Sequence, residues 1–359
     1  MKIWFAANIS KKSHGGVARS MRELARYLQN HGHDVTIVYR SPYINANYLL
    51  FALQVGVRLL IRSACAPDYV IARSTDGLAC AVICRIFKLK TRIVLHNHGW
   101  EEHVYEYEKR LPNSIVTNPT TWKAKLVRFN LLRSTLKISD ICMSGTIDEI
   151  RWLRLKYPQY KKKYACVPNG VSTQASAYWH RQPEKPLSFL CIGPPTWKKN
   201  IAYAIALFSA IYNRNPQARI YLIGTGVEDI HVLFSLAGLP HNSLIHVSRE
   251  NPDTMSKWYT TCPNLLACSR YEGGHSFAIL EALSYAMMVF ASPIPSNKEI
   301  INNGHNGYLL SCTNAHTDAQ MILTALADSS CADKIRHHAY QSSIRHAWPR
   351  QAKRLEKIL

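Results

Sequence analysis

A glycine-rich loop with a carboxylate on each side follows one of the predicted strands. The strand is expected at residues 264–268, and the loop runs from Glu272 through two glycines to a helix that begins near Ser276. The first backbone N–H groups of a helix attract anions, so this loop suits a phosphate group. Glu281 lies on that helix, and both glutamates could accept hydrogen bonds from the hydroxyls of a sugar and a ribose.

Two histidines lie at the end of another predicted strand at residues 92–96: His96 is its last residue and His98 follows it. Ligands bind beyond the carboxyl ends of strands in open α/β sheets, so this position favours ligand contact. Packing within the loop is the alternative interpretation. A metal site is disfavoured, because no third ligand stands at a convincing spacing.

Adjacent glycines, Gly15 and Gly16, lie between a predicted strand at residues 2–7 and a helix at residues 17–30. They would let backbone N–H groups approach an anion, although a plain turn would also use them. The GxGxxG and GxxxxGK[ST] fingerprints are absent from this loop, which argues against a dinucleotide-binding dehydrogenase and a P-loop nucleotidase.

Lys198 and Lys199 open a helix after the strand that ends at Gly193. They could hold a diphosphate, or they could form a solvated helix start. Asn169 lies in a tight turn after another strand, and this turn need not have any further role.

Two series of alternating strands and helices surround these residues. The first has strands at residues 2–7, 35–39, 69–72 and 92–96, and the second has strands at residues 187–193, 219–224, 244–247, 264–268 and 289–292. This alternation predicts an α/β protein with two doubly wound parallel sheets. The domains are expected at residues 1–172 and 187–340, with a polar hinge at 173–186.

The chain of 359 residues carries a formal charge of 44 − 23 = +21. Residues 1–183 contribute 28 − 11 = +17, and residues 184–359 contribute 16 − 12 = +4. A field this basic favours a nucleic acid, an anionic membrane or an acidic substrate. The 47% content of hydrophobic residues argues against intrinsic disorder.

Ten cysteines lack CxxC spacing, which favours buried thiols in a reducing cytoplasm. The first residues resemble a strand and not a signal peptide. The longest apolar stretch, residues 48–66, contains Arg58 and Arg62 and is short for a membrane span. We therefore expect a helix that is soluble or associated with a surface.

In this order the segments resemble the retaining glycosyltransferases of the GT-B fold, family 4. The resemblance runs over nearly the whole chain and includes the Gly15-Gly16 unit, the loop from Gly193 to Asn200, and the pair Glu272 and Glu281. It implies two Rossmann-like domains facing a central cleft, with the acceptor on the first domain and the nucleotide-sugar on the second. It also implies a final helix, at about residues 341–359, that returns to the first domain.

The resemblance assigns roles to individual residues. His98 would lie near the transferred sugar, with His96 the second choice, and Lys199 would neutralise the leaving diphosphate. Glu272 would hold the donor sugar and Glu281 the ribose. The remaining expected substrate contacts are Gly15, Gly16, Arg19, Asn169, Lys198, Gly274, His275 and Ser276.

The sequence departs from the family pattern in two places. Eight residues separate Glu272 from Glu281, where the family has seven, and Pro194 stands where the family has arginine. Neutralisation of the diphosphate then depends mainly on Lys199, helped by Lys198 or Arg19. No DxD motif is present, so fixed positive groups and helix termini are expected to replace a metal ion.

The expected activity is transfer of a sugar, with a UDP-sugar as donor and without cofactor or metal, to a lipopolysaccharide core or similar bacterial surface glycan. Residues 109–163 contain 13 Lys and Arg and three acids, with interleaved aromatic residues. We expect a basic, aromatic surface there that docks a cytoplasmic enzyme on the anionic inner membrane. A solvated face is the alternative.

Two other functions remain open at this point. A basic, non-enzymatic nucleic-acid-binding protein would explain the charge, but no recognised nucleic-acid-binding motif is evident and the Glu272 loop would have no role. Another GT-B enzyme, such as a nucleotide-sugar epimerase, would use the same donor site without an acceptor.

Overall fold

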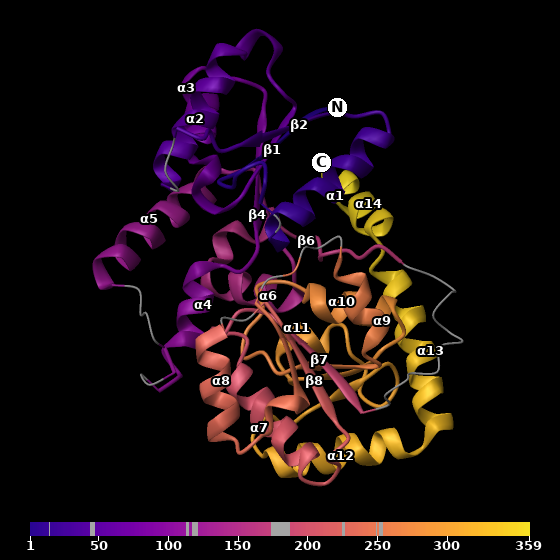
Figure 1. Ribbon diagram of the computed structural model, residues 1–359. Helices are drawn as coiled ribbons and strands as arrows, with labels where there is room; N and C mark the ends of the chain where they lie inside the picture. Colours follow the sequence, from indigo (N-terminus) through magenta and orange to yellow (C-terminus); the bar gives the residue numbers. More distant parts are fainter. Residues whose placement is uncertain are drawn as a thin grey trace. The chain divides into compact units, whose positions relative to one another are not determined.

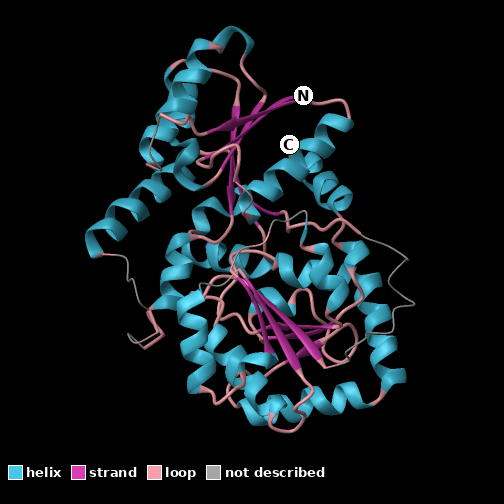
Figure 2. Ribbon diagram, in the orientation of Figure 1, coloured by secondary structure: helices cyan, strands magenta, loops and turns pink. Residues whose placement is uncertain are grey.

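The computed structural model divides the chain into two compact units, each a parallel sheet with helices around it (Figures 1 and 2). The first unit contains Met1–Asn169 and Trp348–Leu359, and the second contains Gly170–Ala347. The structure describes residues 1–13, 15–43, 47–112, 115–116, 121–173, 187–224, 227–248, 250 and 254–359. The expected hinge at residues 173–186 lies outside this part of the chain, apart from Thr173.

The sheet of the first unit has the strand order β2-β1-β3-β4-β5-β6, and every pairing is parallel. Its strands are β1 (Lys2–Ala7), β2 (Asp34–Tyr39), β3 (Tyr69–Ala72), β4 (Arg92–Asn97), β5 (Ile141–Ser144) and β6 (Tyr164–Cys166). Its helices are α1 (Gly16–Asn30), α2 (Tyr48–Ile61), α3 (Leu78–Ile86), α4 (Glu101–Glu108), α5 (Trp122–Ile138), α6 (Ile147–Lys156) and α14 (Trp348–Ile358).

Burial explains why these strands are so apolar. All four residues of β3 are buried, as are the last five of β1. Strands covered by helices on both faces have no polar face, so they appear in a sequence as continuous apolar runs. Trp4 and Ala6 of β1 pack into one core cluster with Phe51 of α2 and Cys80 of α3.

The second unit repeats this plan with the strand order β12-β11-β10-β7-β8-β9. Its strands are β7 (Ser188–Ile192), β8 (Arg219–Ile223), β9 (Leu244–Val247), β10 (Asn264–Ala267), β11 (Met288–Ala291) and β12 (Tyr308–Leu309). Its helices are α7 (Ile201–Tyr212), α8 (Val227–Leu236), α9 (Ser256–Thr261), α10 (Phe277–Ser284), α11 (Pro295–Lys298), α12 (Ala315–Ala327) and α13 (Ser329–Arg345). The predicted class, two doubly wound α/β domains, is confirmed.

The segment that returns to the first unit begins at Trp348 and not at about residue 341. The difference arises because α13 continues without a break to Arg345 and packs against α10 in the second unit. Helix α14 packs against α1, with Leu355 fully buried. A hydrogen bond of 2.8 Å between His33 Nε2 and Glu356 Oε1 holds the end of α14 in place.

Each sheet has one switch point, which is the place between two neighbouring strands where the chain reverses the direction in which it adds strands. In the first unit this point lies between β1 and β3, because β2 pairs with the other edge of β1. In the second unit it lies between β7 and β10. Open α/β sheets bind ligands beyond the carboxyl ends of the strands at such points.

None of the helices in the described part of the chain is both long enough and apolar enough to cross a bilayer.

Candidate active site

Lys199 and Glu272 meet at the switch point of the second unit. Lys199 follows β7 and Glu272 follows β10, two neighbouring strands, and Lys199 Nζ lies 2.5 Å from Glu272 Oε1. The side chains are 24% and 15% exposed, so water can screen this ion pair only in part. The fold therefore brings together two residues that are 73 positions apart.

Glu272 is held in place on one side only. Its Oε1 atom also accepts a hydrogen bond of 2.7 Å from Ser269 Oγ. Among the described residues, both hydrogen bonds of this carboxylate fall on Oε1, which leaves Oε2 for a ligand. Ser269 was not predicted as a site residue, although it lies two residues after the end of β10.

The loops that carry this pair are joined through their backbones. Arg270 donates its N–H to the carbonyl oxygen of Lys198 at 2.7 Å. The ammonium group of Lys198 lies 5.7 Å from the ring centre of Trp197 and 5.5 Å from that of Tyr271. Lys198 is thus a cation above aromatic rings, whereas Lys199 makes the contact with the carboxylate.

Gly193 leaves room for the Lys199 side chain, because it has no Cβ atom. Its φ of +135° lies in the region that favours glycine, and a Cβ atom there would lie 3.0 Å from Cγ and Cδ of Lys199. Any larger residue at this position would displace the lysine side chain.

Helix α10 begins beside this pair, with Ser276 as its N-cap residue. The first N–H groups of a helix have no acceptor within it, which makes them donors for an anion. His275 is buried, and its Nε2 lies 3.1 Å from Glu299 Oε2. That contact fixes the His275 ring at the start of the helix, where Gly274, His275 and Ser276 follow one another.

Glu281 lies on the buried side of α10. The hydroxyl of Tyr259 donates a hydrogen bond to Glu281 Oε2. The ring of Tyr259 stacks on that of Tyr285 at 5.2 Å. Glu281 is therefore a carboxylate whose orientation is set by a tyrosine that the sequence analysis did not identify.

In the first unit, His96 and His98 lie at the carboxyl end of β4, with ring centres 4.4 Å apart. Burial lowers the pKa of His96 to about 4. The pKa of His98 also lies well below its ordinary value, first because of burial and then because of His96 and Arg73. Both rings are neutral at pH 7, so they can form hydrogen bonds without supplying positive charge.

A cavity of about 210 Å³ lies at the switch point of the first unit. It is lined by Asn8 after β1, by Arg73 and Asp76 after β3, and by Glu101 and Arg128. Burial raises the pKa of Asp76 to about 7, although the carboxyl accepts the N–H of Asn8 at 3.0 Å. None of these residues was predicted, yet Arg73 and Asp76 follow a buried strand in the same way as the two histidines.

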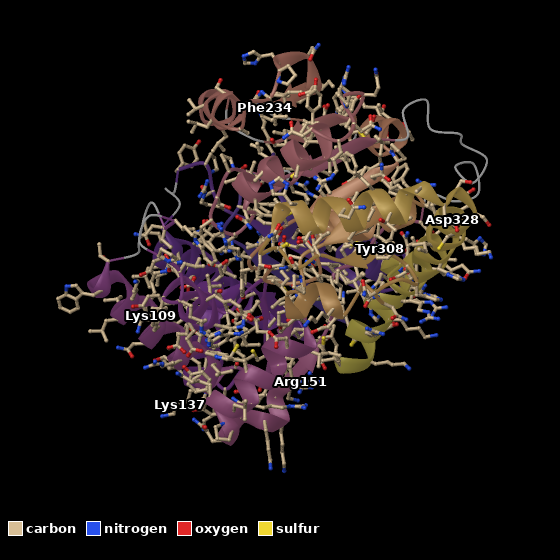
Figure 3. All side chains as sticks on the ribbon, turned by 90° about the horizontal axis from the view of Figure 1, so that it is seen from below. Lys109, Lys137, Arg151, Phe234, Tyr308 and Asp328 are labelled. Carbon is tan, nitrogen blue, oxygen red and sulfur yellow. The ribbon has the colours of Figure 1, made fainter. Side chains whose placement is uncertain are left out.

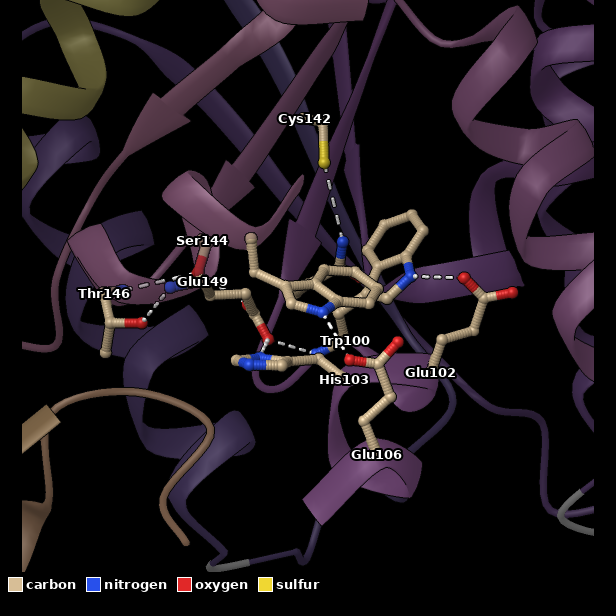
Figure 4. Close-up of polar contacts among 10 residues, drawn as sticks. Trp100, Glu102, His103, Glu106, Cys142, Ser144, Thr146 and Glu149 are labelled. Carbon is tan, nitrogen blue, oxygen red and sulfur yellow. Dashed lines mark hydrogen bonds and ion pairs between the residues drawn. The ribbon is translucent and has the colours of Figure 1, made fainter. Parts of the chain in front are cut away.

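The loop that follows His98 is anchored by a buried glutamate (Figure 4). Glu149 accepts a hydrogen bond from the backbone N–H of Trp100 and another, at 2.6 Å, from Ser144 Oγ. The side chain of Thr146 caps the helix that carries Glu149, by accepting its N–H at 3.2 Å. Glu149 is 2% exposed, so its bond to Trp100 fixes the backbone two residues beyond His98.

The other residues expected to bind substrate have less distinctive surroundings. Gly15 is the N-cap residue of α1, and both Gly15 and Gly16 are exposed at its start. Arg19 is half-buried one turn further along α1. Asn169 is buried at the end of the first unit.

Metal ligands do not cluster in the described part of the chain: it contains no group of three or more His, Cys, Asp or Glu side chains suited to hold an ion.

The expected basic, aromatic surface at residues 109–163 has most of its cations exposed but only part of its aromatic residues. Lys109, Lys137 and Arg151 are exposed (Figure 3). The aromatic residues are divided: Trp122 is 70% exposed, whereas Trp152, Tyr157 and Tyr160 are partly buried, and the Trp152 indole donates to Glu106 at 2.8 Å. Trp152, Tyr157 and Tyr160 pack against the hydrophobic cluster that includes Trp100.

Two family profiles match the chain one after the other. The first is described as Glycosyltransferase Family 4 and matches residues 14–175, and the second, Glycosyl transferases group 1, matches residues 179–342. The chain belongs to the GT-B glycosyltransferases of group 1 and family 4. The GT-B fold places two Rossmann-like domains in one chain, in agreement with the two sheets.

Curated relatives are distant and longer than this chain. The GtfA subunit of a UDP-N-acetylglucosamine–peptide N-acetylglucosaminyltransferase from Streptococcus gordonii is 21% identical over 300 residues. That match covers 79% of this chain and 56% of GtfA. A poly(glycerol-phosphate) α-glucosyltransferase from Bacillus subtilis is 24% identical, with 42% of this chain and 22% of the relative covered. The chain thus matches little more than half of one relative and less than a quarter of the other.

Solved structures resemble the chain over its whole length. HepE from Anabaena, in complex with UDP, has a TM-score of 0.71 at 15% identity, and 99% of each chain is covered. The lipopolysaccharide outer core galactosyltransferase WaaB has a TM-score of 0.72 at 15% identity, with 100% of this chain and 99% of that chain covered. At such identity the likeness shows the fold alone.

Proposed function

We propose that this protein is a retaining glycosyltransferase that moves a sugar from a UDP-sugar to a lipopolysaccharide core or a similar anionic surface glycan. The observation that carries the proposal is the contact of Lys199 with Glu272 at the β7/β10 switch point, beside the start of α10. It combines a cation for a diphosphate with a carboxylate for sugar hydroxyls in one place.

The proposed roles follow from the contacts. Lys199 has three N–H donors, so it can turn from Glu272 toward a diphosphate. The backbone N–H groups of Gly274, His275 and Ser276 would bind phosphate or sugar oxygens, and Glu281 would accept the ribose hydroxyls. Oε2 of Glu272 would accept a hydroxyl of the donor sugar, which also fixes the sugar relative to the diphosphate.

Retention of the anomeric configuration is part of this proposal. Lys199 and the start of α10 would stabilise the negative charge that develops on the diphosphate as the bond to the sugar breaks. The acceptor hydroxyl would then attack from the same face, and the departing phosphate oxygen would take its proton. His98 is neutral, so it would donate a hydrogen bond to the transferred sugar and not a full charge.

The acceptor would bind the first unit. Residues 1–183 hold +17 of the +21 charge, and Arg73 and Arg128 line the cavity at the β1/β3 switch point. These features favour an acceptor with phosphate or carboxylate groups. Residues Gly15, Gly16, Arg19, His96 and Asn169 would complete the substrate contacts from this unit. Contact with the cytoplasmic face of an anionic bacterial membrane belongs to the same proposal.

Donor binding can be tested by thermal shift with UDP-, GDP- and ADP-sugars. A ligand at 100 times its Kd stabilises the folded state by about 2.7 kcal/mol, which is several degrees in a chain of this size. We expect UDP-sugars to raise Tm in the parent protein and in a Lys334→Met control, an exposed lysine on α13. Loss of the shift in Lys199→Met alone supports the site, whereas an equal shift in both variants contradicts it.

Product analysis tests the reaction itself. Donor and a lipopolysaccharide core oligosaccharide should yield a product whose anomeric configuration, read by nuclear magnetic resonance, matches the donor. An inverted product would contradict the retaining mechanism. Conversion of the donor sugar without acceptor would instead support a nucleotide-sugar epimerase.

A further inference from the structure

Helix α2 is apolar on nearly all sides. Only Tyr48, Gln54 and Arg58 are polar among its 14 residues. A helix with this composition is normally buried all round or in contact with lipid. In this structure one face is buried against the rest of the first unit, and the opposite face is exposed. The buried residues are Phe51, Ala52, Val55, Gly56 and Leu59.

The uncovered side of α2 is a continuous stripe. Its exposed apolar residues are Leu49 (41%), Leu50 (47%), Leu53 (56%), Val57 (51%), Leu60 (37%) and Ile61 (78%). At 3.6 residues per turn they occupy about 120° of the helix circumference, next to Gly56. Isolated exposed apolar residues are common on protein surfaces, but a contiguous stripe marks a surface that binds something.

Helix α3 widens this stripe. Gly56 lies so close to α3 that a Cβ atom there would be 2.9 Å from Ala79 Cβ and from Ile83 Cδ1. Val82 and Ile86 flank Ile83 on the side away from the buried residues of α3, and they are 40% and 67% exposed. Together with Phe87 (54%) they continue the stripe of α2, and the whole surface is named the α2–α3 patch.

Exposed cations outnumber acids in the segment that carries the α2–α3 patch. Arg62, Arg85, Lys88 and Lys90 are exposed. Residues 47–90 contain only two acids: Asp76 is buried, and Asp68 accepts the backbone N–H of Lys2. A second copy of the chain would be a poor occupant, because a two-fold interface would bring these cations against one another.

We propose that the α2–α3 patch inserts its apolar side chains into an anionic phospholipid surface, with the exposed cations of the same segment on the headgroups. The combination of an apolar stripe and flanking cations is what such a surface requires. The inference rests on the membrane contact in the proposed function. It places that contact on α2 and α3 instead of residues 109–163, where Trp152, Tyr157 and Tyr160 pack against a core cluster.

Vesicle sedimentation of the full chain tests the patch. The double variant L53S/V57S removes two exposed side chains one turn apart, and V232S/L236S does the same on α8, where the side chains are 59% and 80% exposed. With vesicles of phosphatidylglycerol and phosphatidylcholine, we expect L53S/V57S to partition at least about tenfold more weakly than the parent protein. V232S/L236S should match the parent, and R85Q/K88Q/K90Q should lose the preference for phosphatidylglycerol over pure phosphatidylcholine.

Three results would overturn the inference. Equal partitioning of L53S/V57S and the parent would place the contact elsewhere on the chain. Failure of the parent to bind anionic vesicles at low salt would remove the membrane contact altogether. A dimer in sedimentation velocity without lipid, lost in L53S/V57S, would assign the patch to a second copy. The UDP-sugar thermal shift, measured on the same variants, reports the donor site separately, so failure of docking and failure of the proposed transfer activity are distinguishable.

Discussion

Replacing Asp76 with asparagine should stabilise the protein, and more so as the pH rises. The carboxyl is 4% exposed and its pKa is raised from 3.8 to about 7, chiefly by burial. The folded state therefore keeps a proton that the unfolded chain has already lost between pH 3.8 and about 7. In this window the unfolded state binds fewer protons, so the free energy of unfolding falls as the pH rises.

The size of the effect follows from the difference in pKa. A pKa difference of about three units corresponds to about 4 kcal/mol of folding stability. This contribution is fully present below pH 3.8 and is lost above pH 7. Asparagine has no charge to bury, and its Oδ1 can still accept the N–H of Asn8. The advantage of Asp76→Asn over the parent protein should grow by about 3 kcal/mol between pH 5 and pH 8, which is several degrees in Tm for a chain of this size.

Differential scanning calorimetry of parent and variant across this pH range provides the measurement. His96 and His98 titrate in the opposite direction, because their pKa values are lowered, and stability is lost as the pH falls below 6.5. Both proteins carry these histidines, so the difference in Tm cancels them. A difference that stays constant from pH 5 to pH 8 would refute the reasoning, since Asp76 would then be ionised in the folded state.

Substitutions at four other residues have defined outcomes. Lys199→Met should weaken UDP binding by about 10- to 100-fold in calorimetric titration, because a charge-assisted hydrogen bond is lost; unchanged affinity would contradict its role. Glu272→Gln should leave UDP affinity equal or tighter while weakening UDP-sugar binding, so an equal loss for both ligands counts against the sugar contact. Gly193→Ala should reduce turnover and lower stability by about 1–3 kcal/mol in urea titration, because φ is +135° and the Lys199 side chain must move. Glu149→Ala should lower stability by about 3 kcal/mol, and Glu149→Gln should restore most of it by accepting from Trp100 N–H.

The strands were predictable because burial on both faces makes them uninterrupted apolar runs. β1 is observed at the predicted residues, and the helix predicted at residues 17–30 begins one residue earlier. The loops after β4, β7 and β10 were identified by the same reasoning, since a polar or glycine-rich segment after a buried strand lies at the ligand-binding edge. Roles for the individual residues of these loops remain predictions.

The contacts among site residues could not be predicted from spacing. Ser269 bonding to Glu272, and Tyr259 bonding to Glu281, depend on which loops the strand order places side by side. Asp76 was overlooked for a related reason: its burial comes from packing around β1 and β3, and nothing in the local sequence reveals it. That Trp152, Tyr157 and Tyr160 pack against a core cluster while Trp122 is exposed could not be predicted either, because composition does not say which side chains meet the core.

The carboxyl groups at the two switch points, Glu272 and Asp76, have different surroundings, and the difference suits different ligands. At the β7/β10 point Glu272 forms an ion pair with Lys199; in the proposed function a diphosphate would draw the lysine away and leave the carboxylate to the sugar hydroxyls. At the β1/β3 point Asp76 is buried without an ion pair among the described residues, and it is close to half protonated near neutral pH. A buried acid in that state can donate or accept a hydrogen bond, which suits a neutral hydroxyl beside an anionic group held by Arg73 or Arg128. The cavity of the first unit thus combines the buried carboxyl of Asp76 with the charged side chains of Arg73, Glu101 and Arg128, whereas the second unit presents the ion pair of Lys199 and Glu272.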